Sequence, residues 1–177
     1  MTVNVPQNYV LLVKYASIHT GLPYQVVACQ ANLESGFNAN AVSPAGAEGW
    51  LQFLPSTFAA YGSGSPFNPQ DETYAYVNFM NQLLRDFGGD VRKALAAYNA
   101  GPGNYQAGLG YADTILRCAN SPIILNVKPQ PGEKTSGLGP GPDTAADDWS
   151  WYIHQAANHL EVLGRRAGQY SIGIRRL

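Results

Sequence analysis

The sequence predicts an all-α fold: a compact multi-helix globule over about the first 120 residues, followed by a C-terminal helical appendage. Three observations predict it. Apolar residues recur at a spacing of three and four positions in most segments, which is typical of amphipathic helices. Residues that start or stop helices, namely Pro, Asp and Gly, stand at the borders of these segments. No credible run of strands interrupts them.

The expected helices of the globule begin and end at identifiable residues. Gly21 stops the first helix, and Pro23 suits the first turn of the second. Asp71 and Asp90 can cap two later helices. The sequence GPGN at 101–104 breaks the chain before the last one. In order, helices are expected over residues 8–20, from Pro23 to about Ser35, from Pro55 to about Tyr61, from Asp71 to Phe87, from Asp90 to the GPGN break, and over Tyr111–Ala119.

A tract rich in Pro and Gly at residues 129–144 is typical of a linker. A last helix follows it, reaches about Arg166 and carries one apolar stripe. This helix is expected to fold back onto the globule, with docking on a partner protein as the alternative. The expected organisation is a globular domain at 1–121, a linker at 122–144, and a helix with a tail at 145–177.

Composition excludes some partners and leaves the ligand class open. Charged residues make up 13% of the chain and the formal net charge is −1, so no nucleic acid partner is expected. Eleven Tyr and three Trp on so weakly charged a chain fit a neutral, ring-shaped ligand such as a sugar. Tyrosines at the edge of the core explain the same composition, and composition alone favours them.

Neither a metal nor a cofactor is expected. Cys29 and Cys118 are too few and too far apart for a zinc site or a redox CxxC motif. They leave two interpretations open, a disulfide or two buried thiols, and buried thiols are preferred. The three histidines, His19, His154 and His159, show no ligand spacing with Cys or carboxylates.

The N-terminus shows no export signal. The apolar run Tyr9–Val13 is too short, no basic region precedes it and no small-residue cleavage site follows. No stretch approaches about eighteen consecutive apolar residues, so no transmembrane helix is expected. The chain is expected to be a monomer.

Glu34 is the first candidate for chemistry. It would lie at the C-terminal end of a helix, where the helix dipole disfavours negative charge, between the apolar residues Leu33 and Phe37. Both effects raise the pKa of a carboxyl group. A carboxyl that stays neutral near pH 6–7 is what a general acid needs to protonate a leaving oxygen.

Three further segments offer groups that suit a pyranose. In the loop at 43–53, Gly and Ala residues allow close backbone approach, and Gln52 offers a donor and acceptors. Trp50, Leu51 and Phe53 are expected to add apolar surface there. The stretch AAYNAGPGN presents Tyr98 and Asn99 at a helix end, and LGYADTIL presents Tyr111.

The same segments resemble the soluble lytic transglycosylase family, which has a lysozyme-like fold. ESGFNANAVSPAGAEGWLQFLPSTF is similar to the family's first signature, with its Glu-Ser pair, Ser-x-x-Gly-Ala turn and Gly-Leu-Met-Gln turn. FGGDVRKALAAYNAGPGN is similar to the second motif, and the tyrosine of GYADTIL to that of the third. The motifs stand in the family's order over about residues 8–120.

The resemblance implies a role for each matching residue. Glu34 would be the sole catalytic acid and base, with Tyr98 hydrogen-bonded to its carboxyl. Gln52 and Asn99 would hold the glycan, Ser43 would line the turn beside the acid, and Tyr111 would close the cleft behind it.

Two departures from the family pattern stand out. Leu51 replaces the methionine that usually meets the N-acetyl group of the sugar, a swap of similar volume. The acidic residue often found shortly before the third motif's tyrosine is absent, and Gly-Leu-Gly at 108–110 stands there instead.

The family's chemistry explains a lone acid. Most glycoside hydrolases use two carboxylates, but substrate-assisted enzymes use the 2-acetamido group of the sugar. The implied reaction cleaves the β-1,4 bond between N-acetylmuramic acid and N-acetylglucosamine in peptidoglycan and forms a 1,6-anhydro end. Two alternatives remain: a hydrolytic muramidase with a second carboxylate such as Glu48, and a non-catalytic wall-binding or virion structural protein.

The substrate implied by this resemblance is the glycan strand of the cell wall, outside the cytoplasmic membrane. Because no export signal is seen, a bacteriophage enzyme is expected, carried in the virion or released through a membrane lesion. The alternative is a shortened piece of an exported protein to which Met1 was added. The C-terminal helix could then also bind wall polymer.

Overall fold

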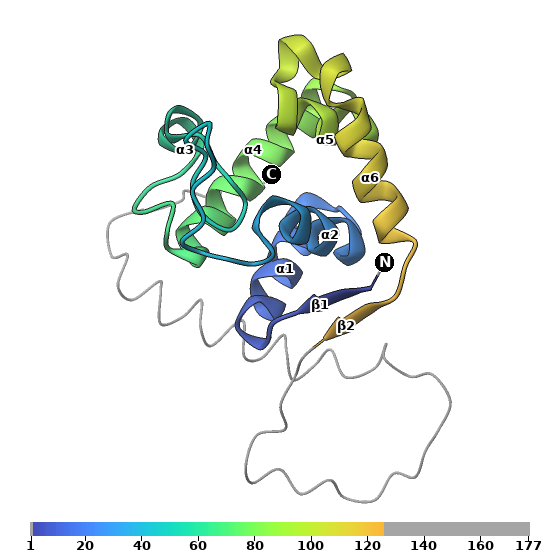
Figure 1. Cartoon of the computed structure of the whole chain (residues 1–177). Helices are drawn as coiled ribbons and strands as arrows, with labels where there is room; N and C mark the ends of the chain where they lie inside the picture. The colour runs from blue at the N-terminus through green and yellow to red at the C-terminus, as the bar shows by residue number, and fades with distance from the viewer. Residues whose placement is uncertain (1, 126–177) are drawn as a thin grey trace, which may run out of the picture. The chain divides into compact units, whose positions relative to one another are not determined.

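The computed structural model of the chain describes residues 2–125 (Figure 1). The expected final helix and tail, and all of the expected linker beyond residue 125, lie outside the described residues.

The described residues are mainly helical, which confirms the fold class. The helices are α1 (Gln7–Thr20), α2 (Tyr24–Ser35), α3 (Pro55–Tyr61), α4 (Pro69–Asp86), α5 (Val91–Ala100), the 3₁₀ segment η1 (Pro102–Gly108) and α6 (Leu109–Ala119).

The helix borders follow local chemistry, with one correction. Asp90 caps α5 as predicted, since its side chain accepts a hydrogen bond from the backbone N–H of Lys93. Asp71 does not cap α4. Asn68 does so, accepting from the N–H groups of Gln70 and Asp71, and the helix therefore begins at Pro69. Proline is favoured at this first position because its missing N–H has no helical partner.

Two short strands were not predicted. β1 (Val3–Val5) and β2 (Ile123–Leu125) pair in parallel, with Val3 opposite Ile123, and lie side by side in Figure 1. Three-residue segments are too short to show the alternation that marks a strand, and their pairing joins opposite ends of the domain. The sequence therefore carried no local signal for them.

The hydrophobic core lies between the helices and the 49–53 turn. α2 packs against both α1 and α6, and α4 packs against α1, α3 and α5. Trp50, Leu51 and Phe53 are buried in this core, so the expectation that they form apolar surface for a ligand is wrong. The Trp50 ring lies 5.0 Å from that of Tyr9, in a tilted arrangement favourable for aromatic pairs.

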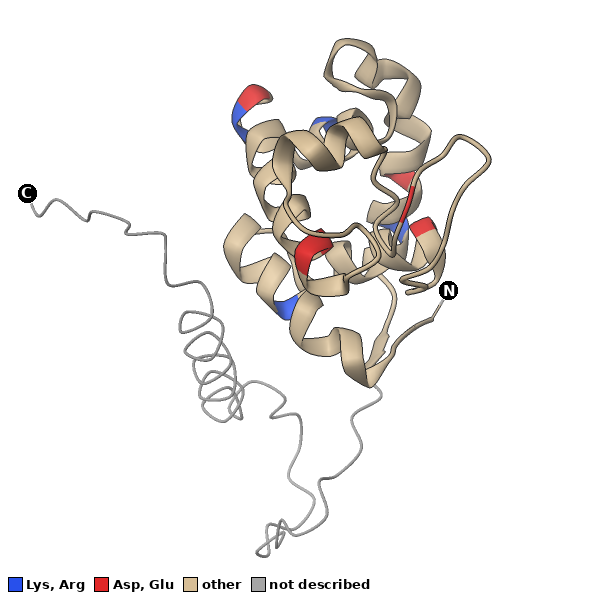
Figure 2. Cartoon of the chain, turned by 90° about the vertical axis from the view of Figure 1, so that its left-hand side faces the viewer, with Lys and Arg blue, Asp and Glu red and all other residues tan. Residues whose placement is uncertain are grey.

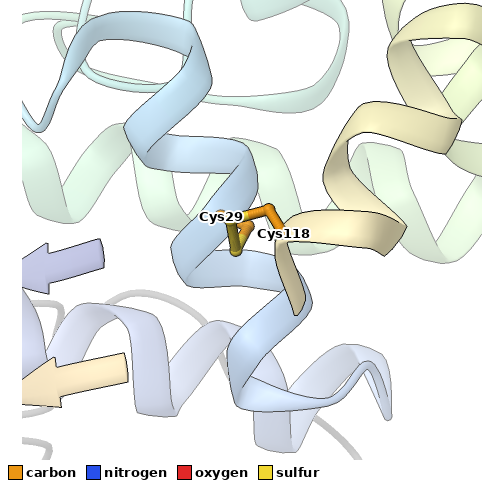
Figure 3. Close-up of a disulfide and its surroundings, with 2 residues drawn as sticks. All are labelled: Cys29 and Cys118. Atoms are coloured by element: carbon orange, nitrogen blue, oxygen red, sulfur yellow. A yellow bond between two sulfur atoms is a disulfide. The ribbon is translucent and has the colours of Figure 1, made fainter. Parts of the chain in front are cut away.

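A disulfide joins Cys29 on α2 to Cys118 on α6, with 5.9 Å between the Cα atoms (Figure 3). This corrects the preference for two buried thiols. The bond closes a sequence separation of 89 residues, which removes much of the chain entropy of the unfolded state. It also links two helices that carry candidate site residues: Glu34 lies at the end of α2, and Tyr111 lies at the start of α6.

Among the helices of residues 2–125, none combines the length and the apolar character needed to cross a bilayer. In Figure 2, acidic and basic residues are scattered over separate elements, and most of the described chain consists of uncharged residues.

Removal of the disulfide is expected to destabilise the protein strongly. The double variant Cys29→Ala/Cys118→Ala should lose about 2–4 kcal/mol of unfolding free energy, because its unfolded chain is no longer cross-linked. Denaturant unfolding followed by circular dichroism measures the difference. Reductant should lower the midpoint of the wild type and leave that of the double variant unchanged; equal midpoints without reductant would contradict the prediction.

Candidate active site

Glu34 lies in the last turn of α2, half-buried, and its carboxyl accepts a hydrogen bond from the Tyr111 hydroxyl of α6. Burial raises the pKa of Glu34 to about 7, although the Tyr111 hydrogen bond acts in the opposite direction. This agrees with the reasoning from sequence that apolar surroundings favour the neutral form. A group with a pKa near 7 is able both to give and to take a proton near neutral pH.

The two site tyrosines differ from the predicted arrangement. The Tyr98 hydroxyl donates to the carbonyl oxygen of Leu51 at 2.8 Å, and the hydrogen bond predicted between Tyr98 and Glu34 is made by Tyr111 instead. Burial, followed by the charge of Glu34, raises the pKa of both tyrosines well above the ordinary value. Both hydroxyls therefore remain protonated and act as donors.

The turn at 49–53 is joined to the end of α2. The Ser35 hydroxyl, next to Glu34 in sequence, donates to the carbonyl oxygen of Trp50 at 2.8 Å. Gln52 has a φ of 56°, in the left-handed region that few non-glycine residues adopt. Its side-chain nitrogen donates to the carbonyl oxygens of Gly49 at 2.8 Å and Ala41 at 3.3 Å. Gln52 thus connects the turn to the preceding loop.

Glu72 of α4 is a site residue that the sequence analysis missed. Its side chain is 0% exposed, and its two carboxyl oxygens accept the N–H groups of Trp50 at 2.7 Å and Leu51 at 2.8 Å. Burial raises the pKa of Glu72 to about 8, backbone N–H donors of the turn lower it, and nearby Glu34 raises it. An acid in the first turn of a helix normally faces solvent and the helix dipole, so its sequence position gave no sign of burial.

The other predicted residues take different positions. The Ser43 hydroxyl accepts the N–H of Ala47 at 3.0 Å and shapes the loop that precedes the turn. Asn99 is exposed in the last turn of α5. Leu51 is 0% exposed, which contradicts the expected direct contact between its side chain and a sugar. Glu48 is half-buried, and its backbone pairs with that of Phe53.

The structure thus places two sets of hydrogen bonds at the end of α2: Tyr111 donates to Glu34, while Ser35 and Tyr98 donate to the turn that contains Gln52. Within residues 2–125, no three His, Cys, Asp or Glu side chains are grouped so as to hold a metal ion.

Residues 12–115 match the family model described as the Transglycosylase SLT domain. This span is more than half of the 177 residues. The chain belongs to the SLT family.

Two relatives illustrate how much of an SLT protein this chain represents. It is 30% identical over 99 residues to the soluble lytic murein transglycosylase of Escherichia coli K12, covering 50% of this chain and 15% of that protein. It is 28% identical over 160 residues to the peptidoglycan transglycosylase gp16 of Escherichia phage T7, covering 77% of this chain and 12% of that protein. The chain therefore corresponds to a small part of either relative.

The fold is also similar to a solved SLT structure. An inactive mutant of the lytic transglycosylase Slt from Pseudomonas aeruginosa superposes with a TM-score of 0.53 at 21% identity. The match covers 61% of this chain and 22% of that one. It supports the lysozyme-like fold of this SLT domain.

Substitution of Tyr111 is expected to change the titration of Glu34. In Tyr111→Phe, the hydrogen bond that lowers the pKa of Glu34 is lost, so this pKa should rise above about 7. Carboxyl ¹³C chemical shifts of labelled glutamate measure it. Tyr98→Phe is the matched control, because its hydroxyl contacts Leu51, and should give a smaller change. A fall in the pKa of Glu34 in Tyr111→Phe would refute the assignment.

Replacement of Glu34 should stabilise the fold at high pH. The folded-state pKa of about 7 lies above the ordinary value of 4.5, so the wild type loses stability as pH rises between these values. Glu34→Gln avoids this loss, and should be as stable as the wild type at about pH 4 and about 1–3 kcal/mol more stable at about pH 8. Urea unfolding at both pH values tests this; a constant difference between the two proteins would contradict it.

Proposed function

We propose that this chain is a peptidoglycan lytic transglycosylase that cleaves the β-1,4 bond between N-acetylmuramic acid and N-acetylglucosamine and leaves a 1,6-anhydro end. One observation in this SLT-family member carries the proposal: the Glu34 carboxyl is half-buried and hydrogen-bonded to Tyr111, and its pKa is raised to about 7. The substrate is inferred from the relatives, which are named murein and peptidoglycan transglycosylases.

In the proposed reaction, Glu34 acts twice. As a neutral acid it gives its proton to the glycosidic oxygen while the bond from that oxygen to C1 of the muramyl residue breaks. The 2-acetamido group of the substrate stabilises the electron-poor C1. Glu34, now a carboxylate, removes the proton from the C6 hydroxyl of the same residue, and that oxygen bonds to C1. The acid is regenerated, and no water is consumed.

The Tyr111 hydroxyl suits both steps. As a donor it stabilises the carboxylate formed after the first proton transfer, while burial favours the neutral acid that begins the cycle. Because the C6 hydroxyl belongs to the substrate, its effective concentration at C1 far exceeds that of a free molecule. Exclusion of water from the site then favours the anhydro product over a hydrolysed one.

The environment of Glu72 supports a single catalytic carboxyl. Both oxygens of Glu72 accept backbone N–H groups, and its side chain has no exposed surface to offer a substrate. Direct contacts of Ser43, Gln52 and Asn99 with the glycan are part of the proposal, as is action at the cell wall by a bacteriophage enzyme. A relative from phage T7 supports the phage origin.

Digestion of purified sacculi tests the function. The wild type should release muropeptides that are one water lighter than hydrolysis products by mass spectrometry. Glu34→Gln should lose at least about a hundredfold in rate, since its amide cannot give or take the proton, while its circular dichroism spectrum is unchanged.

Glu48→Gln is the matched control from the neighbouring loop and should keep its activity. Hydrolysed ends, together with an inactive Glu48→Gln, would instead establish a muramidase with two carboxylates. Clearing of sacculi at equal rates by the wild type and Glu34→Gln would refute the catalytic assignment of Glu34.

A further inference from the structure

A fully buried carboxyl that plays no part in the proposed chemistry requires an explanation. Glu72 lies in the first turn of α4, with 0% exposure. Burial of an ionisable side chain is costly unless its polar atoms are satisfied. Here each carboxyl oxygen accepts one backbone N–H, that of Trp50 at 2.7 Å and that of Leu51 at 2.8 Å.

The two residues whose N–H groups Glu72 binds are also held at their carbonyl oxygens. The carbonyl oxygen of Trp50 accepts from the Ser35 hydroxyl, and that of Leu51 from the Tyr98 hydroxyl, both at 2.8 Å. Three helices, α2, α4 and α5, therefore fix two consecutive residues of one turn. One of these anchors, Ser35, is the immediate neighbour of Glu34.

The residue that follows these two has an unfavourable backbone. Gln52 adopts a φ of 56°, a conformation that costs a non-glycine residue free energy and persists where surrounding contacts enforce it. The fixed N–H groups of Trp50 and Leu51 supply such contacts directly before it. Strain of this kind is found at functional sites, where it orients a side chain.

Gly49 shows that the approach of Glu72 depends on a residue without a side chain. A Cβ atom at position 49 would lie 2.2 Å from Oε2 of Glu72 and 2.3 Å from the carbonyl oxygen of Pro66. Its φ of 81° also favours glycine. The turn and the carboxyl thus fit each other closely.

We propose that Glu72 is a positioning residue of this site: its carboxyl group holds the Gly49–Phe53 turn beside the end of α2, so that Gln52 and the Tyr98 contact keep their places relative to Glu34. The inference rests on the proposed function, since it concerns the geometry of the same reaction. Glu72 does not touch the substrate. It acts through the backbone of the turn.

Glutamine cannot replace this group. Two neighbouring N–H donors require two acceptor oxygens, which a carboxyl offers and a primary amide does not. In Glu72→Gln, the amide nitrogen would face one of the two N–H groups and leave it unsatisfied in a buried place. Small displacements of a reacting group reduce rates steeply. We therefore expect Glu72→Gln to disturb the geometry of the site and lower the rate while the protein remains folded.

Kinetics on soluble glycan strands from peptidoglycan test the proposal. Glu72→Gln should lower kcat by at least about tenfold and change KM by less than about threefold. Gly49→Ala, which displaces the carboxyl without removing it, should give the same pattern. Leu83→Ala is the stability control: it removes a buried side chain from the same helix and should keep kcat at a temperature where all the variants are folded.

Amide NMR of the wild type adds a measurement that needs no variant. The amide protons of Trp50 and Leu51 should be protected from exchange, and in Glu72→Gln at least one of them should lose this protection. Free exchange of both in the wild type would overturn the proposal even if Glu72→Gln did not fold.

The outcomes for the two proposals are distinct. A wild type without anhydro product, or an active Glu34→Gln, would refute the proposed function. The role of Glu72 would be refuted, with the proposed function intact, if the wild type is active and folded Glu72→Gln has a normal kcat. It would also be refuted if Leu83→Ala loses as much kcat as Glu72→Gln does.

Discussion

The backbone groups of two consecutive residues in the Gly49–Phe53 turn are buried, and their need for hydrogen-bond partners organises the centre of the domain. Trp50 and Leu51 have no exposed surface, so water cannot satisfy their backbone groups. Side chains from three helices do so instead: Glu72 binds the N–H groups, and Ser35 and Tyr98 bind the carbonyl oxygens. A buried peptide without a partner costs free energy comparable to a lost hydrogen bond, which makes these contacts mutually dependent.

Glu34 and Glu72 show how environment separates the roles of two buried acids. The carboxyl of Glu34 is half-buried and accepts from a tyrosine hydroxyl, whereas that of Glu72 is fully buried and accepts from backbone N–H groups. Burial raises both pKa values, to about 7 and about 8. Exposure and the type of donor therefore distinguish the carboxyl proposed to act on a substrate from the one proposed to hold the backbone of the turn.

The disulfide joins the two helices on which Glu34 and its hydrogen-bond donor Tyr111 lie. Cys29 lies on the helix that carries Glu34, and Cys118 on the helix that carries Tyr111. The covalent link and the Tyr111–Glu34 hydrogen bond thus join the same pair of helices at two points. Such a double connection limits how far the acid and its donor can separate without unfolding α6.

The sequence by itself determined the helical fold class, most helix borders, the acid at position 34 and the set of segments around it. Those features depend on local spacing, capping and motif residues. Tertiary structure alone decided the partners. Tyr111 contacts Glu34 across 77 positions, Glu72 contacts Trp50 across 22, and the cysteines pair across 89. No local pattern encodes such contacts, because they depend on how completed helices pack; for this reason Tyr98 was assigned the wrong partner, Leu51 was expected at the surface and Glu72 was missed.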